Sequence, residues 1–86
     1  MKRGNIVLVQ VPFVGAPGSK LRPALVVQSN RLNAMIRETI IAAITSNLSN
    51  VNQDHQLLID LSTTEGASSG LLMDSAVRCE RLHTVH

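Results

Sequence analysis

The residue best placed for chemistry is Arg22, in the stretch GAPGSKLRPALVVQSN from Gly15 to Asn30. It follows a segment rich in Gly, Pro and Ser that is typical of a mobile loop, and it precedes a run of strand-forming residues. A side chain at such a junction is positioned by the scaffold while its head group stays available to a ligand. Because a guanidinium binds anions through several donors, the sequence predicts an anion site here.

The positive charges are unevenly placed, although the net charge is only +2. The cations are Lys2, Arg3, Lys20, Arg22, Arg31, Arg37, Arg78 and Arg81. If the loop and C-terminal cations converge in the fold, they form a local patch for an anionic ligand. The other four cations, at positions 2, 3, 31 and 37, are better interpreted as solvated surface. Phe13 is the only aromatic residue, so a site built on several stacked bases is a poor fit.

Other catalytic arrangements find little support in the sequence. The acidic residues lack a close paired spacing and no His pair has helical zinc spacing, so we expect no metal site. His55, His83 and His86 could supply the two imidazoles of a pancreatic-type ribonuclease, but strand-edge or terminal histidines are usually solvent-facing. Cys79, the only cysteine, excludes an internal disulfide and is better interpreted as a small, partly buried side chain than as a nucleophile.

Short strands must position these residues. Apolar, β-branched runs predict strands at 5–11, 23–28, 39–45, 55–61, 71–77 and 78–85. Residues 30–37 predict a short helix that begins at an Asn30 cap, and 14–21, 46–54 and 62–70 predict loops. Many short strands with one helical insertion indicate a small antiparallel barrel or sandwich.

The length of 86 residues corresponds to one domain with a small core, which a partner chain would help to stabilise. The sequence has no apolar run of membrane-spanning length and no charged-then-apolar leader. We therefore expect a soluble, cytoplasmic protein that does not bind membranes.

Four stretches in this order resemble the MazF/PemK family of toxin endoribonucleases. They are RGNIVLVQVPF at Arg3–Phe13, GSKLRPALVVQSN at Gly18–Asn30, AITS at Ala43–Ser46, and DSAVRCERLHTV at Asp74–Val85. Each stretch alone is a weak signal, whereas their combined order and spacing is specific. The resemblance covers nearly the whole chain.

The resemblance implies a single domain over residues 1–86 with a mainly β, SH3-like antiparallel barrel. It implies the toxin of a type II toxin–antitoxin system, which cleaves single-stranded RNA, usually mRNA, at short sequences without a metal. A homodimer and a cognate MazE-like antitoxin that covers the RNA groove are also implied. The catalytic pair of the family falls on Arg22 and Thr45. The substrate contacts fall on Phe13, Ser19, Lys20, Ser46 and Arg81, the last standing where many members have Gln.

These residue types suit metal-free RNA cleavage, in which the neighbouring 2′-hydroxyl is the nucleophile. The protein then has to align the attack and stabilise charge on the phosphorane. Arg22 is expected to stabilise that charge. A further role of Arg22 is to act as the general acid that protonates the leaving 5′-oxygen. Thr45 is expected to bind the phosphate or the attacking hydroxyl, while Lys20 adds positive potential.

The chain departs from the family pattern in two places. The first loop has no acidic residue at 15–17, and the chain stops at His86, where members usually continue into a C-terminal helix. Three interpretations stay open, namely a truncated form, which we favour, a naturally short member, and the ordered part of a longer chain; without the helix we expect apolar surface to be exposed. Two alternatives therefore stay open: a non-catalytic barrel that binds antitoxin or RNA, and a gyrase poison of the CcdB type. The retained pair of Arg22 and Thr45 favours the enzyme.

Overall fold

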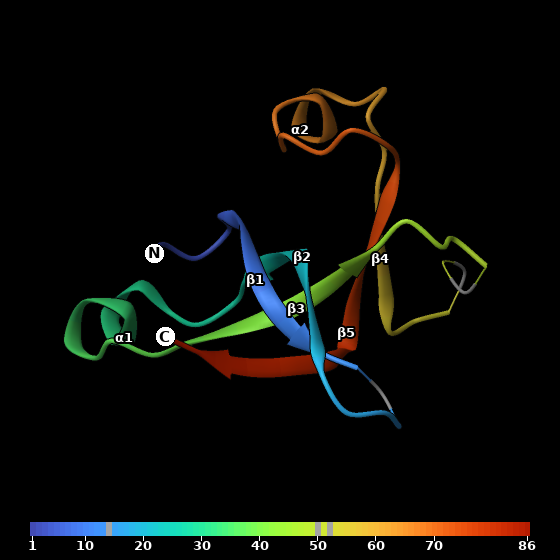
Figure 1. Ribbon diagram of the computed structural model, residues 1–86. Helices are drawn as coiled ribbons and strands as arrows, with labels where there is room; N and C mark the ends of the chain where they lie inside the picture. The colour runs from blue at the N-terminus through green and yellow to red at the C-terminus, as the bar shows by residue number, and fades with distance from the viewer. Residues whose placement is uncertain (14, 50, 52) are drawn as a thin grey trace.

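The structure, a computed structural model, describes residues 1–13, 15–49, 51 and 53–86. Its elements are β1 (Ile6–Pro12), β2 (Ser19–Val26), α1 (Asn30–Met35), β3 (Thr39–Thr45), β4 (Gln56–Ile59), α2 (Thr64–Ala67) and β5 (Ser75–Val85). The five strands form one antiparallel sheet in the order β1-β2-β3-β5-β4. Figure 1 shows the strands running in different directions, so the sheet is curled and not flat. The predicted class, a small mainly β fold with a short helical insertion, is confirmed.

Strands β1 and β2 form a hairpin that is paired from Ile6 opposite Leu25 to Pro12 opposite Ser19. The predicted loop at 14–21 is therefore too long, because the ladder continues to Ser19; position 14 lies outside the described residues. The Phe13 amide donates to the Gly18 carbonyl at 3.0 Å and closes the turn. Gly18 has φ +99, where a side chain would be strained, and an added Cβ would meet the Phe13 ring at 3.4 Å.

Helix α1 is shorter than predicted and begins one residue earlier at its cap. The N-cap is Ser29, whose hydroxyl accepts from the Leu32 amide at 3.4 Å, and the helix ends at Met35. A polar network anchors it to the sheet: the Asn33 Oδ1 atom accepts from Gln28 Nε2 at 3.0 Å and from Thr39 Oγ1 at 2.7 Å. Gln28 and Thr39 are buried, so these bonds satisfy groups that water cannot reach.

The predicted strands at 71–77 and 78–85 are wrong as two elements, because β5 is one strand that begins at Ser75. Its register with β3 jumps: Ala43 pairs with Arg78, whereas Ala42 pairs with Leu82. Residues 79–81 are left without a partner on β3 and form a corner in β5. Such a bulge bends a strand without breaking it, which is why no turn residue is needed between the two halves.

The prediction of a loop throughout 62–70 is wrong, because this segment contains a short helix, α2. Thr63 caps it: its hydroxyl accepts from the Gly66 amide at 3.0 Å and donates to the Asp60 carbonyl at 2.7 Å. The preceding strand β4 spans only Gln56–Ile59 and is shorter than predicted. It ends there because the chain turns at Asp60, whose carboxylate accepts a hydrogen bond from the Ser62 amide at 2.9 Å.

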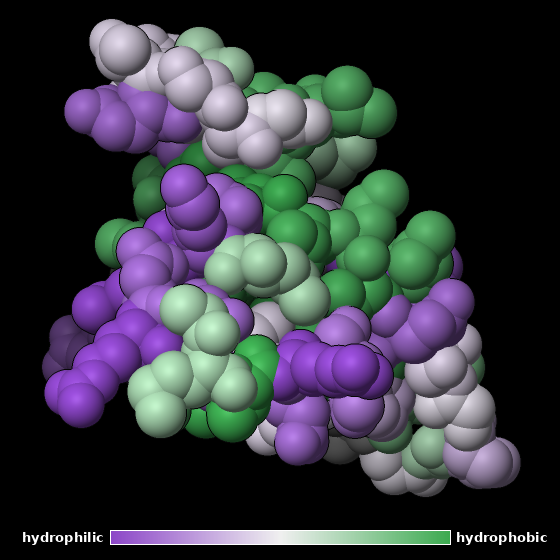
Figure 2. Space-filling model, turned by 90° about the vertical axis from the view of Figure 1, so that its left-hand side faces the viewer, coloured by the Kyte–Doolittle hydropathy of each residue, from purple (hydrophilic) through white to green (hydrophobic). Residues whose placement is uncertain are grey.

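The two faces of the curled sheet carry separate apolar clusters. One contains Ala24, Val26 and Ile41, and the other contains Ala42, Ile44 and Val77, as expected from the alternation of side chains along β2 and β3. Large apolar side chains also remain exposed, among them Leu72 at 94%. Figure 2 shows apolar surface gathered beneath α2. Within the described part of the chain, no helix is both long and apolar enough to cross a bilayer.

Candidate functional site

Arg22 and Thr45 are brought together by the register of β2 and β3. The last hydrogen-bonded pair of these strands is Ala24 opposite Ala43. Extending this antiparallel register by two residues places Arg22 across from Thr45. Because side chains alternate between faces, a step of two keeps both residues on the face of the Ala24–Ala43 pair. The two predicted catalytic residues, distant in the sequence, are therefore expected on the same face of neighbouring strands.

Arg22 lies inside β2, opposite Val9, and not at the junction of a loop and a strand as predicted. The hairpin ladder extends three residues before it, so its backbone is fixed on the β1 side. Its side chain is exposed. Pro23 follows directly, just before the residues that pair with β3, so its missing amide donor removes no bond from the β2–β3 ladder.

Both residues line a hollow of about 200 Å³ to which four strands contribute. Two further predicted site residues, Phe13 and Arg81, line the same hollow. Arg78 and His83 of β5 also face it, and neither was assigned to the site from the sequence. Four of the seven predicted site residues thus share one cavity.

The other three predicted residues lie around this hollow and not in its wall. Ser19 donates from its hydroxyl to Gln10 Oε1 at 3.1 Å on the exposed hairpin. Lys20 is exposed and pairs with Val11, which lines the hollow. Ser46 lines a second, apolar cavity of about 510 Å³, to which Arg22 also contributes. A larger cavity of about 650 Å³, between β1, β4 and α2, contains no predicted site residue in its wall.

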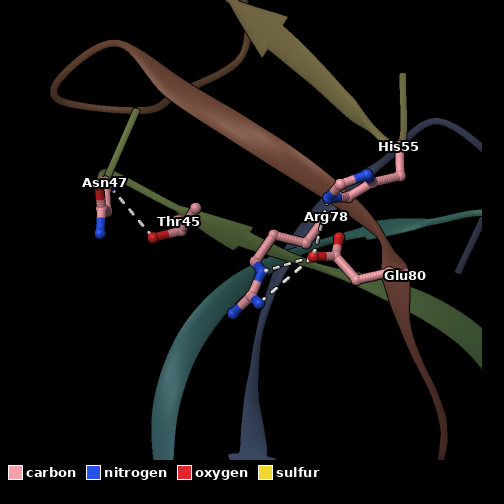
Figure 3. A network of polar contacts seen from close by, with 5 residues as sticks. All are labelled: Thr45, Asn47, His55, Arg78 and Glu80. Atoms are coloured by element: carbon pink, nitrogen blue, oxygen red, sulfur yellow. Dashed lines mark hydrogen bonds and ion pairs between the residues drawn. The ribbon is translucent and has the colours of Figure 1, made fainter. Parts of the chain in front are cut away.

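The hydroxyl of Thr45 is oriented by the chain that follows β3. Its Oγ1 atom accepts the Asn47 amide at 3.1 Å, as Figure 3 shows. A hydroxyl that accepts one hydrogen bond still has its own proton to donate. Thr45 is half-buried in the wall of the hollow, so that donor is available to a ligand held there.

Glu80 holds Arg78 in place at the corner of β5. Its Oε2 atom lies 3.3 Å from Arg78 Nη2 and 3.6 Å from His55 Nε2 (Figure 3). Partial desolvation raises the pKa of Glu80, but a hydrogen bond from its own backbone amide and the charge of Arg78 outweigh this and lower the pKa overall. The carboxylate is therefore ionised at neutral pH. Because the Arg78 and Glu80 side chains are about one-third exposed, their ion pair contributes to orientation more than to stability.

The hollow is positively charged. Among the described residues, Arg22, Arg78 and Arg81 line its wall and no Asp or Glu does, although the Glu80 carboxylate pairs with Arg78 at 3.3 Å. The Nε atom of Arg81 is buried and has no hydrogen-bond partner there, so it is a donor that a bound anion could satisfy. Nowhere in the described ranges do three His, Cys, Asp or Glu side chains cluster closely enough to hold a metal ion.

Arg78 was considered from the sequence only as one of the C-terminal cations that could converge with the loop, and His83 was set aside as a strand-edge histidine; the facing of both depends on the corner in β5. Arg78 and Arg81 are three residues apart, which in a regular strand would place them on opposite faces. The unpaired residues 79–81 reset the alternation, and both arginines face the hollow. The same corner exposes Cys79, so the prediction that this side chain is partly buried is wrong.

Comparisons with known proteins bear on the identity of this site. A search of curated proteins gives no match. A search of protein families matches residues 2–86 to the family described as PemK-like, MazF-like toxin of type II toxin-antitoxin system. This match covers the hairpin, the site strands and the corner of β5. The chain therefore belongs to the PemK-like, MazF-like toxin family of type II toxin–antitoxin systems.

Proposed function

We propose that this toxin is a metal-independent, sequence-specific endoribonuclease that cleaves single-stranded RNA, with mRNA as its target, and so inhibits translation and growth. The observation that carries the proposal is the convergence of Arg22 and Thr45 on one positively charged hollow through the β2–β3 register. A phosphodiester is the anion whose cleavage these two side chains can assist without a nucleophile from the protein.

In the proposed reaction the scissile phosphate lies in the hollow and the adjacent 2′-hydroxyl attacks it in line with the leaving 5′-oxygen. Arg22 binds the non-bridging oxygens and stabilises the charge that grows on them in the transition state. The Thr45 hydroxyl donates a hydrogen bond to a phosphate oxygen, and Arg78 and Arg81 add positive charge from β5. Phe13 at the root of the hairpin tip contacts a base next to the cleaved bond.

We also propose the partners that the family pattern implies. The toxin acts in the cytoplasm as a single-domain homodimer, and a cognate MazE-like antitoxin inhibits it by covering the hollow. Ser19 and Lys20 on the exposed hairpin and Ser46 after β3 contact RNA on either side of the scissile phosphate. Their positions around the hollow, outside its wall, suit contacts to flanking nucleotides.

The test is to incubate the purified chain with a long single-stranded RNA of mixed sequence in EDTA and to map the new ends. We expect cleavage at a recurring short sequence with 2′,3′-cyclic phosphate ends. Arg22→Ala should lower the rate by about 10²-fold or more, since it removes a transition-state donor. Arg31→Ala is the matched control, because Arg31 is an exposed arginine of α1, away from the hollow.

Two results would contradict the proposal. Intact RNA after incubation with the folded wild-type chain would favour a binder without catalytic activity. A binding assay that shows affinity for RNA or antitoxin would then identify it as such a binder. Cleavage by Arg22→Ala at the wild-type rate would show that the hollow is not the active site.

A further inference from the structure

Metal-free cleavage by the 2′-hydroxyl needs a group that accepts the proton of that hydroxyl. Among the side chains already assigned to the site, none does this well near neutral pH. The guanidinium groups of Arg22, Arg78 and Arg81 offer hydrogen-bond donors and no acceptor, and the Thr45 hydroxyl is a weak base. The proposed function is therefore incomplete without a proton acceptor.

His83 contributes an imidazole to the wall of the hollow, and an imidazole is a side chain that can accept a proton. It is half-buried, and it takes part in none of the side-chain hydrogen bonds formed by the described residues. Its backbone lies opposite Ile41 on β3, on the same face as Ala43 and Thr45 because these residues are two apart. Beyond the corner at 79–81, the His83 side chain of β5 is therefore on the same face as Arg22 and Thr45.

The other candidates for this role are less well placed. Glu80 does not line the hollow, and its carboxylate already binds Arg78 at 3.3 Å and His55 at 3.6 Å. His55 is exposed, pairs with Glu80 and does not line the hollow, and His86 is exposed at the last residue. The ionisable groups that share the hollow with His83 are Arg22 from β2 and Arg78 and Arg81 from β5; β1 and β3 contribute none to its wall.

We propose that His83 is the general base of this ribonuclease, an inference that rests on the proposed function. The neutral imidazole accepts the proton of the 2′-hydroxyl while the bond from the 2′-oxygen to phosphorus forms and the bond from phosphorus to the 5′-oxygen breaks. The products are a 2′,3′-cyclic phosphate and a 5′-alcohol. The leaving 5′-oxygen takes a proton from water, and the imidazolium returns its proton to the solvent.

The experiment compares the wild-type chain with His83→Gln, His83→Ala and the control His86→Gln. Single-turnover cleavage of one RNA is measured from about pH 5 to about pH 8, the range in which a histidine changes charge. Binding is measured separately with an oligonucleotide that carries a 2′-deoxy group at the cleaved position. This substrate lacks the nucleophile, so its affinity reports binding alone.

We expect His83→Gln to cleave about 10²–10⁴-fold more slowly, the usual effect of losing a general base. Its affinity for the 2′-deoxy oligonucleotide should remain within about threefold of wild type, as a base acts on the rate and not on ground-state binding. The fall in rate toward acid pH should disappear, and added imidazole should partly restore His83→Ala. His86→Gln should match the wild type in every respect.

A rate for His83→Gln close to wild type, with an unchanged pH profile, would overturn the inference while leaving the proposed function intact. A parallel loss of affinity and rate would show a binding role instead, which also overturns it. Intact RNA with the wild-type chain would overturn both proposals. A melting curve for each variant separates these outcomes from loss of the fold.

Discussion

Replacing Thr45 with Val tests the link between the local structure of β3 and the chemistry. Valine has nearly the same shape, so it preserves packing in the half-buried wall of the hollow but removes the oxygen that accepts the Asn47 amide at 3.1 Å. The loss of one such bond costs about 0.5–1.5 kcal/mol of unfolding free energy. For a domain of this size, 1 kcal/mol lowers the melting temperature by about 4–8 °C.

The effect of the same change on activity should be much larger than its effect on stability. The hydroxyl proton of Thr45 is the donor that we place on a phosphate oxygen, and removing one preorganised donor from a transition state slows a reaction by about 10²–10³-fold. Thr45→Ser keeps the hydroxyl and should retain most of the rate. The assay is single-turnover RNA cleavage at a temperature well below the melting transition of both variants.

Two results would refute this reasoning. If Thr45→Val cleaves RNA as fast as the wild type, the hydroxyl has no role in the transition state. If Thr45→Ser is as slow as Thr45→Val although both are folded, the loss comes from altered packing of the β3 end and not from the missing donor.

The remaining predictions concern the scaffold. Gly66→Ala should destabilise the chain by about 1–3 kcal/mol in a urea titration, since the new Cβ would overlap the backbone carbonyl of Asp60. Ile41→Ala should cost about 2–5 kcal/mol in the same titration, because Ile41 is fully buried, whereas Ile41→Val should cost about 0.5–1.5 kcal/mol. Hydrogen bonds from the Ser62 amide and hydroxyl lower the pKa of Asp60, so its carboxylate stabilises the fold above its unfolded pKa, and this contribution is lost as pH falls through the lower folded value. Melting temperatures should therefore fall below about pH 4. Asp60→Asn should weaken this dependence of the melting temperature on pH. An unchanged plot of melting temperature against pH for this variant would argue against a stabilising role of the Asp60 carboxylate.

Much of the sheet could be predicted from the sequence, because local composition decides where an extended, buried segment is favourable. The β3 strand, Thr39–Thr45, coincides with its prediction, and β1 differs by one residue at each end. Both are rich in β-branched side chains that suit a pleated surface. Helix α2 was missed because its four residues carry no apolar periodicity and depend on the Thr63 cap and on contacts to Asp60.

The site was predicted in part. Arg22 was named from its position and residue type and again from the resemblance to a family, which also supplied Thr45, Phe13 and Arg81; the structure places all four on one hollow. The family and the position of the site near the β1–β2 hairpin therefore follow from residue order. The sequence offered Arg78 as part of a possible cation patch and His83 as a less favoured imidazole, but it could not place them on this hollow, because their facing depends on a corner in β5 that no local signal marks.

The sequence by itself determined the residue types, the positions of β1 and β3 to within a residue and the membership of a toxin family, since these depend on local patterning and on motifs read along the chain. Only the tertiary structure decided which of the eight cations share a cavity and what stands beside them. The physical reason is that strand register and the bulge at 79–81 are set by packing between segments far apart in the chain, and a shift of one residue moves a side chain to the opposite face of the sheet.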